Sequence, residues 1–557
     1  MKSSFLNQRF SCLGFLLLGI LFITGPFLSG CSSKVKEMFS ACSDVQQEDE
    51  DEIIVIDLAA SSENTEENEG EFGGGESENL KEIVEWSFEK DGAEAALMEN
   101  SSADKVVLKS QNAEIPQPEN VILMIADGAG FGAFYCAADF LTGSPQGLFY
   151  QQKPWYMTSV ATFHKKSFYD VQKDWADFKN LRVPFYEKEP AFIPPDSAST
   201  GTALMTGIKT RNGRVGIGPN DERLETITEL FRKKGGRTGA VTSFQIASAT
   251  MAATAAHDPE RKNGQKLFAE MFLDGNLDVI IGAGHPEFND DGQRREAVFE
   301  KYGPSEELWG KIRAGFFSEQ WTFAESRESI QAIAERTPDR FEASGAPHVP
   351  LRLLALAPTA NSFQCHRKAG SPLLTSSPTL AQTALAALNI LAFNPQKGND
   401  SLTPNTGGFF LLVEGGAVDA ANDANDLVRC VEEMADFNQA VAAVCDWVEK
   451  YSSWEKTLVI VTADHDNGAI YGPEAGADGI PKTAPIYQGK GILPVAKYYS
   501  DDHTKQLVPI YARGIGAERL VHEFTDGIDE KMGTFWNYDG RFIDNTAVFK
   551  VMTGQKQ

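Results

Sequence analysis

Basic residues are scarce in this chain of 557 residues, which has 51 Lys and Arg against 78 Asp and Glu and a formal net charge of -27. Proteins that bind nucleic acid present an excess of Lys and Arg to the phosphates, so this balance argues against a nucleic-acid-binding surface. About sixteen of the acidic residues lie between Asp44 and Glu85, where Lys81 is the single basic residue. The rest of the chain is therefore only moderately acidic.

Cysteine is also scarce, with seven residues. The spacing lacks the pairs of a zinc ribbon, and the density is too low for a disulfide scaffold. At most two disulfides can form among the cysteines that follow residue 31, and the sequence leaves their pairing open. Cys430 and Cys445 lie in a helical pattern, where we expect them to pack as small apolar side chains. The five cysteines after residue 31 are Cys42, Cys136, Cys365, Cys430 and Cys445.

The first thirty residues have the pattern of a signal peptide, because Lys2 and Arg9 precede an apolar stretch over 13–28. The following Leu28-Ser29-Gly30-Cys31 resembles a bacterial lipobox, in which Cys31 would be acylated and become the mature N-terminus. An uncleaved membrane helix is the alternative, although the stretch is short for a span and contains Gly25-Pro26. We therefore expect a lipid-anchored protein of the cell envelope, on its periplasmic or outer-membrane face.

The remaining chain divides at about residue 115. Residues 31–115 are acidic and rich in Gly and Ser, a composition typical of a tether. From 116 to 557, apolar strand candidates alternate with helical stretches, which predicts an α/β domain with a central, mostly parallel sheet flanked by helices. The stretches 293–404 and 471–499 have weaker patterns, and we expect both to be insertions around the site.

Five clusters of acidic residues or histidines stand out in this domain, most of them beside apolar runs. A carboxylate at the end of a buried strand is strongly disfavoured unless something neutralises its charge. In parallel sheets, ligands gather at the carboxyl ends of the strands, so we expect these clusters to meet there around bound cations. The pattern indicates a metalloenzyme. The clusters are Asp127, Asp196-Ser197, Glu414, Asp464-His465 and His503-Thr504.

These motifs, in this order, resemble those of alkaline phosphatases over about residues 120–517. The resemblance implies hydrolysis of small phosphomonoesters through a phosphoserine, with release of inorganic phosphate, and it suggests a homodimer. It rests on the combination, since each short motif alone is weak. The matching segments are Asp127-Gly128, Asp196-Ser197-Ala198-Ser199-Thr200-Gly201-Thr202-Ala203, Val413-Glu414-Gly415-Gly416, Thr462-Ala463-Asp464-His465 and His503-Thr504.

The resemblance makes Ser197 the nucleophile and Arg261 the group that clamps the phosphate. Ser197 begins a segment of small residues, so its hydroxyl would project at a helix N-terminus, a position that favours anions. Taken alone, the same residues would be an ordinary helix cap beside Asp196. The Arg261 guanidinium can hold two phosphoryl oxygens at once. Two alternatives are that Arg261 is only a solvated residue in a charged turn, or that the adjacent Lys262 binds the phosphate instead.

The resemblance also implies two zinc sites and one magnesium site. The mixed oxygen and nitrogen ligands of the zinc sets and the all-oxygen magnesium set suit those ions. The implied sets are Asp127, Asp464 and His465 for one zinc ion; Asp127, Thr250 and Glu414 for magnesium; and Asp419, Asp423 and His503 for the second zinc ion.

This sequence departs from the family pattern at three positions. Asp423 stands where relatives usually have histidine, and a second carboxylate there favours Mg²⁺ or Mn²⁺ over Zn²⁺. Ser248 replaces an Asp or His, and Ala420 replaces a Lys or His near the phosphate. Two other functions therefore stay open. One is a phosphodiesterase of the same superfamily, and the other is an envelope lipoprotein that binds phosphate or metal with weak or no catalysis.

The lipobox gives a first test. We expect Cys31→Ala to leave the precursor without a lipid, because the thiol that would be acylated is removed. Metabolic labelling with a fatty acid, followed by electrophoresis, measures this. Continued acylation of the Cys31→Ala protein would contradict the lipobox interpretation.

Overall fold

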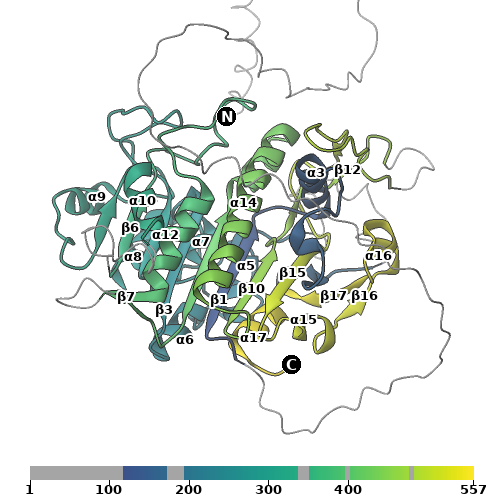
Figure 1. The fold of residues 1–557 in the computed structure, drawn as a ribbon, viewed down its shortest axis with the longest axis horizontal. Helices are drawn as coiled ribbons and strands as arrows, with labels where there is room; N and C mark the ends of the chain where they lie inside the picture. The colour runs from purple at the N-terminus through teal and green to yellow at the C-terminus, as the bar shows by residue number, and fades with distance from the viewer. Residues whose placement is uncertain (1–116, 172–192, 337–350, 396–401, 476–481) are drawn as a thin grey trace, which may run out of the picture. The chain divides into compact units, whose positions relative to one another are not determined.

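The computed structural model describes residues 117–171, 193–336, 351–395, 402–475 and 482–557 (Figure 1). The predicted signal peptide, the tether, Cys31 and Cys42 lie outside these ranges. Within them, every helix is too short or too polar to cross a bilayer.

An eleven-stranded sheet forms the centre of the domain. β15 and β16 run antiparallel to their neighbours, and the other pairings are parallel. The predicted α/β fold with a mostly parallel sheet is therefore confirmed. The strands across the sheet are β16 (Gly527–Ile528), β17 (Arg541–Asp544), β2 (Tyr156–Ala161), β15 (Val508–Gly514), β10 (Thr457–Thr462), β1 (Asn120–Ala126), β9 (Phe409–Gly415), β3 (Arg237–Gln245), β4 (Val279–Ala283), β6 (Leu353–Leu356) and β5 (Thr322–Ala324).

The three central strands bring distant carboxylates to one edge of the sheet. β1 lies between β10 and β9, and its Ile125 is paired with Thr462 on one side and Glu414 on the other. β9 and β10 are buried along their whole length, which explains their continuous apolar sequences. Because the strands are parallel and in register, Asp127, Glu414 and Asp464 all lie at the edge of the sheet where the strands have their carboxyl ends.

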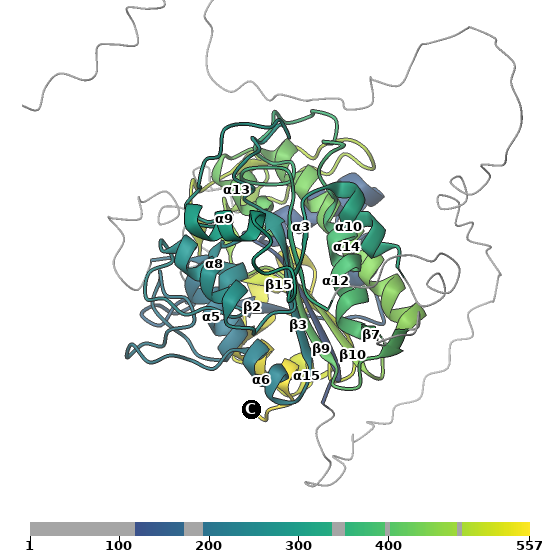
Figure 2. The same ribbon diagram turned by 90° about the vertical axis from the view of Figure 1, so that its left-hand side faces the viewer.

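Helices cover both faces of the sheet, as the view in Figure 2 shows for α10, α12 and α14 on one side and α5, α6 and α8 on the other. The first layer comprises α3 (Phe131–Thr142), α10 (Arg327–Ala334), α12 (Leu380–Ala392) and α14 (Leu427–Tyr451). The second comprises α5 (Ser197–Thr206), α6 (Ile227–Lys233), α7 (Ala249–Ala252), α8 (Gly264–Leu273) and α17 (Asn545–Thr553).

The remaining elements are short. The helices are η1 (Phe149–Gln151), α9 (Glu306–Arg313), α13 (Ala417–Asp423), α15 (Arg519–His522) and α16 (Glu530–Trp536). The strand pairs outside the main sheet are β7 (Phe393–Pro395) with β8 (Leu402–Pro404), β11 (Asp466–Asn467) with β14 (His503–Thr504), and β12 (Ile470–Tyr471) with β13 (Lys497–Tyr498).

The expectation that 293–404 is an insertion is wrong for much of that stretch. Its β5 and β6 extend the main sheet, and its α10 and α12 belong to one helical layer. The strands are only three and four residues long, so their apolar pattern is too short to recognise. The described residues of the 471–499 stretch, 471–475 and 482–499, do lie outside the main sheet. They are held against α3, where Asp139 Oδ2 accepts hydrogen bonds from the backbone of Gln488 (2.8 Å) and Gly489 (3.1 Å).

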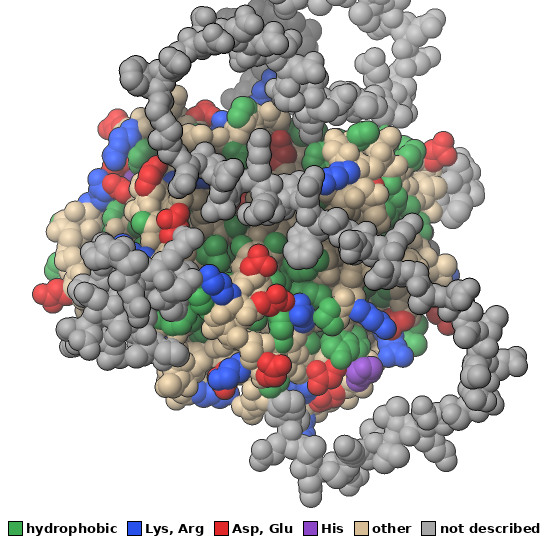
Figure 3. Space-filling model, in the orientation of Figure 1, with side chains coloured by type: hydrophobic (Ala, Val, Ile, Leu, Met, Phe, Trp, Pro, Cys, Tyr) green, Lys and Arg blue, Asp and Glu red, His purple; other side chains and the backbone are tan. Residues whose placement is uncertain are grey.

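The four cysteines in the described part of the chain are free thiols. Cys430 and Cys445 are buried on α14, which confirms their predicted role as small core residues, and Cys136 and Cys365 are also free thiols. Acidic and basic side chains are interspersed over the described part of the face in Figure 3.

Candidate active site

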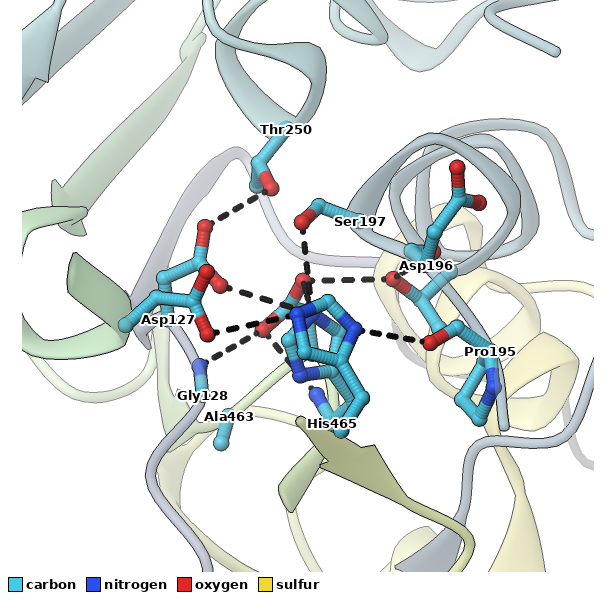
Figure 4. Close-up of polar contacts among 12 residues, drawn as sticks. Asp127, Gly128, Pro195, Asp196, Ser197, Thr250, Ala463 and His465 are labelled. Carbon is cyan, nitrogen blue, oxygen red and sulfur yellow. Dashed lines mark hydrogen bonds and ion pairs between the residues drawn. The ribbon is translucent and has the colours of Figure 1, made fainter. Parts of the chain in front are cut away.

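Ser197 is the first residue of α5. The helix begins there because the Asp196 carboxylate accepts a hydrogen bond from the Ser199 backbone N–H (2.9 Å), which caps the first turn. Ser197 is only 3% exposed, and its Oγ lies 3.2 Å from His465 Nε2 (Figure 4). The hydroxyl therefore sits at a helix N-terminus, where backbone N–H groups favour an anion.

Asp127, Asp464 and His465 form the first candidate metal-binding group, named here the Asp464 group. His465 Nε2 lies 3.3 Å from Asp464 Oδ2 and 3.6 Å from Asp127 Oδ1, and all three side chains are buried. Asp464 Oδ1 accepts hydrogen bonds from the backbone N–H groups of Gly128 (3.1 Å) and His465 (3.0 Å). These two bonds direct Asp464 Oδ2 toward the imidazole.

Thr250 and Glu414 lie against the other side of Asp127. Thr250 Oγ1, on α7, donates to Asp127 Oδ2 at 3.4 Å (Figure 4). Ser248, one of the three positions that depart from the family pattern, donates from Oγ to Glu414 Oε2 at 3.5 Å. The residues predicted to bind magnesium are thus brought together, with Ser248 next to them.

Asp419, His465 and His503 form a second candidate group, named here the His503 group. The two imidazole rings stack with their centres 3.7 Å apart. His503 Nε2 lies 3.5 Å from Asp419 Oδ1, and His503 Nδ1 lies 2.9 Å from the Pro195 carbonyl oxygen. The carbonyl fixes the ring so that Nε2 faces Asp419.

Asp423 lies outside both groups. It is exposed, and its Oδ1 accepts a hydrogen bond from Asn467 Nδ2 at 2.8 Å, while the same Nδ2 donates to Asp419 Oδ1 at 2.7 Å. The structure therefore brings Asp423 next to Asp419 through an amide. Its role as a metal ligand stays a prediction.

Several buried carboxylates lie close together in the site, and this raises the pKa values of some of them. Burial raises the pKa of Asp127 well above its usual value, and the Asp464, Asp419 and Glu414 carboxylates raise it further. Burial also raises the pKa of Glu414 to about 7. Burial lowers the pKa of His465, which keeps the imidazole neutral and able to bind a metal.

His503 and Asp419 behave as an ion pair. Burial alone would lower the pKa of His503, but the Asp419 carboxylate outweighs it and raises that pKa to about 10. Burial would likewise raise the pKa of Asp419, but His503 lowers it below the usual range. A proton on His503 therefore occupies the position that a cation would take.

The residues present fit divalent cations. Three buried atoms, Asp127 Oδ1, Glu414 Oε1 and His465 Nδ1, have no hydrogen-bond partner. Unsatisfied carboxylate oxygens in a buried cluster are costly, and a divalent ion would remove that cost. The carboxylates, the Thr250 hydroxyl and the two imidazoles are the donor types that Zn²⁺ and Mg²⁺ use.

Arg261 reaches the site from the segment between α7 and α8. Its Nη1 lies 3.2 Å from Asp196 Oδ2, and its backbone N–H donates to the Gly213 carbonyl at 2.7 Å. Its side chain is 29% exposed, so the guanidinium faces both the cap of α5 and the solvent. The neighbouring Lys262 is exposed, which favours Arg261 of the two. His257 instead binds Glu270 and the Leu224 carbonyl, a structural role.

Sequence reasoning missed two polar residues of the site. Thr200, one turn into α5, donates to Asp464 Oδ2 at 3.2 Å, and Asn467 bridges Asp419 and Asp423. Thr200 is three residues from the predicted nucleophile, and Asn467 is two residues from His465. Their closeness in the sequence to predicted site residues is the signal that could have identified them as part of the site.

The chain is similar in sequence to known proteins. A family model described as alkaline phosphatase matches residues 118–517. The Bacillus subtilis alkaline phosphatase 4 is 28% identical over 297 residues, which cover 52% of each chain, so this chain spans about half the length of that relative. The streptomycin-6-phosphate phosphatase of Streptomyces griseus is 28% identical over 436 residues, 73% of this chain and 87% of that protein.

A solved structure, the alkaline phosphatase from the Antarctic bacterium TAB5, superposes with a TM-score of 0.50. At 20% identity it covers 79% of this chain and 100% of that one. This likeness supports the fold.

The side chains of the site would make metal binding dependent on pH. In the metal-free protein, the raised pKa of Glu414 gives stability that is present below its unfolded pKa of about 4.3 and lost as pH rises through about 7. A bound cation would offset that loss, and it would compete with the proton of His503.

We expect the rise in Tm on adding Zn²⁺ and Mg²⁺ to metal-free protein to be several degrees larger at pH 8 than at pH 6. Differential scanning calorimetry measures it, and titration calorimetry in buffers of different ionisation enthalpy measures the released protons. An equal Tm shift at both pH values, with no proton released, would show that these side chains do not hold the ion.

Proposed function

Because the chain belongs to the alkaline phosphatase family, we propose that it is a metal-dependent phosphomonoester hydrolase that releases inorganic phosphate through a phosphoserine at Ser197. The observation that carries the proposal is the position of Ser197 Oγ, 3.2 Å from a histidine that belongs to both candidate metal-binding groups. The N-terminus of α5 and the Arg261 guanidinium lie beside it and can both bind phosphoryl oxygens.

The reaction divides into two displacements at phosphorus. In the first, Ser197 Oγ loses its proton and forms a bond to phosphorus, while the bond to the departing alcohol oxygen breaks and that oxygen takes up a proton. In the second, water attacks the phosphoserine and the Ser197 oxygen leaves, which regenerates the hydroxyl. Phosphoryl transfer needs mainly positioning and charge neutralisation, and the site is built for these.

The chain's own residues would hold three divalent ions. The Asp464 group would hold one Zn²⁺. Asp419, Asp423 and His503 would hold a second divalent ion. Asp127, Thr250 and Glu414 would hold Mg²⁺. When bound, the ions supply the positive charge that lowers the pKa of a serine hydroxyl and offsets charge on the phosphoryl and departing oxygens. At the site formed by Asp419, Asp423 and His503, the Asp423 carboxylate would favour Mg²⁺ or Mn²⁺ over Zn²⁺.

We further propose that the enzyme acts outside the cytoplasm, anchored through lipidated Cys31. Its substrates would be small phosphomonoesters, and family resemblance suggests a homodimer. The support is the sequence pattern of residues 1–31 and the acidic, Gly- and Ser-rich composition of the residues that follow.

The nucleophile can be tested directly. We expect Ser197→Ala to lower kcat with p-nitrophenyl phosphate by about 10³-fold or more, because the attacking oxygen is lost. Ser199→Ala is the matched control. The buried Ser199 hydroxyl donates to the Asp196 carbonyl in the same helix turn and to Asn212 Oδ1 in the loop after α5, so the variant should keep most activity. Assays with Zn²⁺, Mg²⁺ or Mn²⁺ added in turn define the metal. Equal activity of Ser197→Ala and wild type would rule out Ser197 as the nucleophile.

The unusual Asp423 gives a second test. We expect Asp423→His to raise the amount of zinc that remains bound after dialysis, because an imidazole is a better zinc ligand than a second carboxylate. Elemental analysis of the two purified proteins measures it. Asp501→His, at an exposed position near His503, is the control for an added surface histidine. Unchanged zinc content in Asp423→His would remove Asp423 from the ligands.

A further inference from the structure

A chain of hydrogen bonds connects the 471–499 segment to the turn after Asp127. The Tyr498 hydroxyl, on β13, donates to Asn422 Oδ1 at 2.9 Å. Asn422 Nδ2, on α13, donates to the Gly128 carbonyl oxygen at 3.1 Å. Asn422 is completely buried although it lies between Asp419 and Asp423 of the site. Its side chain is directed to the backbone of the turn.

Gly128 contacts a carboxylate of each candidate group, and the two groups also share His465. Its N–H donates to Asp464 Oδ1 in the Asp464 group. Its φ of +69° is a left-handed conformation that favours glycine, and a Cβ at this position would lie 2.3 Å from Asp419 Oδ1 of the His503 group. The turn therefore lies directly against α13, and the Asn422 amide ties the two together.

The Gly128 carbonyl and the Tyr498 hydroxyl together hold the Asn422 amide. The carbonyl can only accept, so it requires Nδ2 on its side, since in the exchanged orientation the amide oxygen would face the Gly128 carbonyl. The tyrosine hydroxyl then donates to the opposite atom, Oδ1, and keeps the amide in place against the turn. Buried polar groups linked in this way hold one arrangement firmly.

The 471–499 segment holds Tyr498 in a fixed place. The segment is attached to α3 at Asp139, and Gly491 N–H donates to the Phe140 carbonyl at 2.8 Å. At its other end, Tyr498 is paired with Ile470 in the β12–β13 ladder. A Cβ on Gly468 would lie 2.4 Å from the Tyr498 ring, so the ring packs tightly on the backbone that follows His465.

We propose that Asn422 and Tyr498 are positioning residues that set the spacing between the Asp464 group and the His503 group. The proposal rests on the proposed function, because it assumes that both groups bind metal. Neither residue would touch metal or substrate. Each acts through the Gly128 turn, which fixes Asp127 and Asp464 on one side and abuts Asp419 on the other.

The test uses zinc as the probe and compares two adjacent tyrosines in the full-length chain. Tyr498→Phe removes the hydroxyl that donates to Asn422 Oδ1 and keeps the ring. Tyr499→Phe is the matched control, because the Tyr499 hydroxyl donates to the Gly472 and Pro473 carbonyls within the same segment. We expect Tyr498→Phe to bind zinc about fivefold more weakly than wild type, the effect of one net hydrogen bond, whereas Tyr499→Phe retains wild-type zinc affinity.

Competition with a chelator, followed by elemental analysis of the dialysed protein, measures zinc binding independently of activity. A second variant, Asn422→Leu, removes both bonds and should bind zinc more weakly still. With excess zinc, p-nitrophenyl phosphate hydrolysis by Tyr498→Phe should recover, because mass action restores occupancy.

Equal zinc affinity in Tyr498→Phe and Tyr499→Phe, at similar Tm values, would overturn the proposal even if Asn422→Leu fails to fold. If wild type binds zinc but hydrolyses no phosphomonoester, the proposed function fails, while the comparison of the two tyrosine variants still decides this inference.

Discussion

The constraint on which the structure depends is the burial of several carboxylates at one edge of a sheet. Three adjacent parallel strands, β10, β1 and β9, place Asp464, Asp127 and Glu414 within reach of one another. In the absence of positive charge they can coexist only by taking up protons, which is why burial raises the pKa values of Asp127 and Glu414. The apolar strands, the tight Gly128 turn and the capped start of α5 all serve to hold this unfavourable arrangement in place.

Much of the site could be read from the sequence because charged residues at the ends of apolar runs are conspicuous. Asp127, Glu414 and Asp464 each follow or end a buried strand, and the parallel order of those strands then brings them together. Asn422, Asn467 and Tyr498 could not be found in this way. They are neutral, they follow no period, and their partners lie far away in the sequence, 294 residues in the case of Asn422 and Gly128. The short strands β5 and β6 were not predicted for a related reason. A strand of three or four residues is too short to show a recognisable hydrophobic pattern.

The strongly acidic chain and an anionic substrate are compatible because charge acts locally. The acidic excess between residues 44 and 85 lies outside the residues that the structure describes, all of which follow residue 116. Within the site, the N-terminus of α5 and Arg261 are positive, and divalent ions bound by the carboxylates would add to that charge. The net charge of the chain therefore does not describe the local charge beside Ser197.

The site is assembled from segments widely separated along the chain. Gly128 and Asp464, which are hydrogen bonded, are 336 residues apart, and His503 and Pro195 are 308 apart. A nascent chain must therefore be synthesised through β14 before the two imidazoles can stack, and a truncated product that ends before β14 lacks His503 and with it the second candidate metal-binding group.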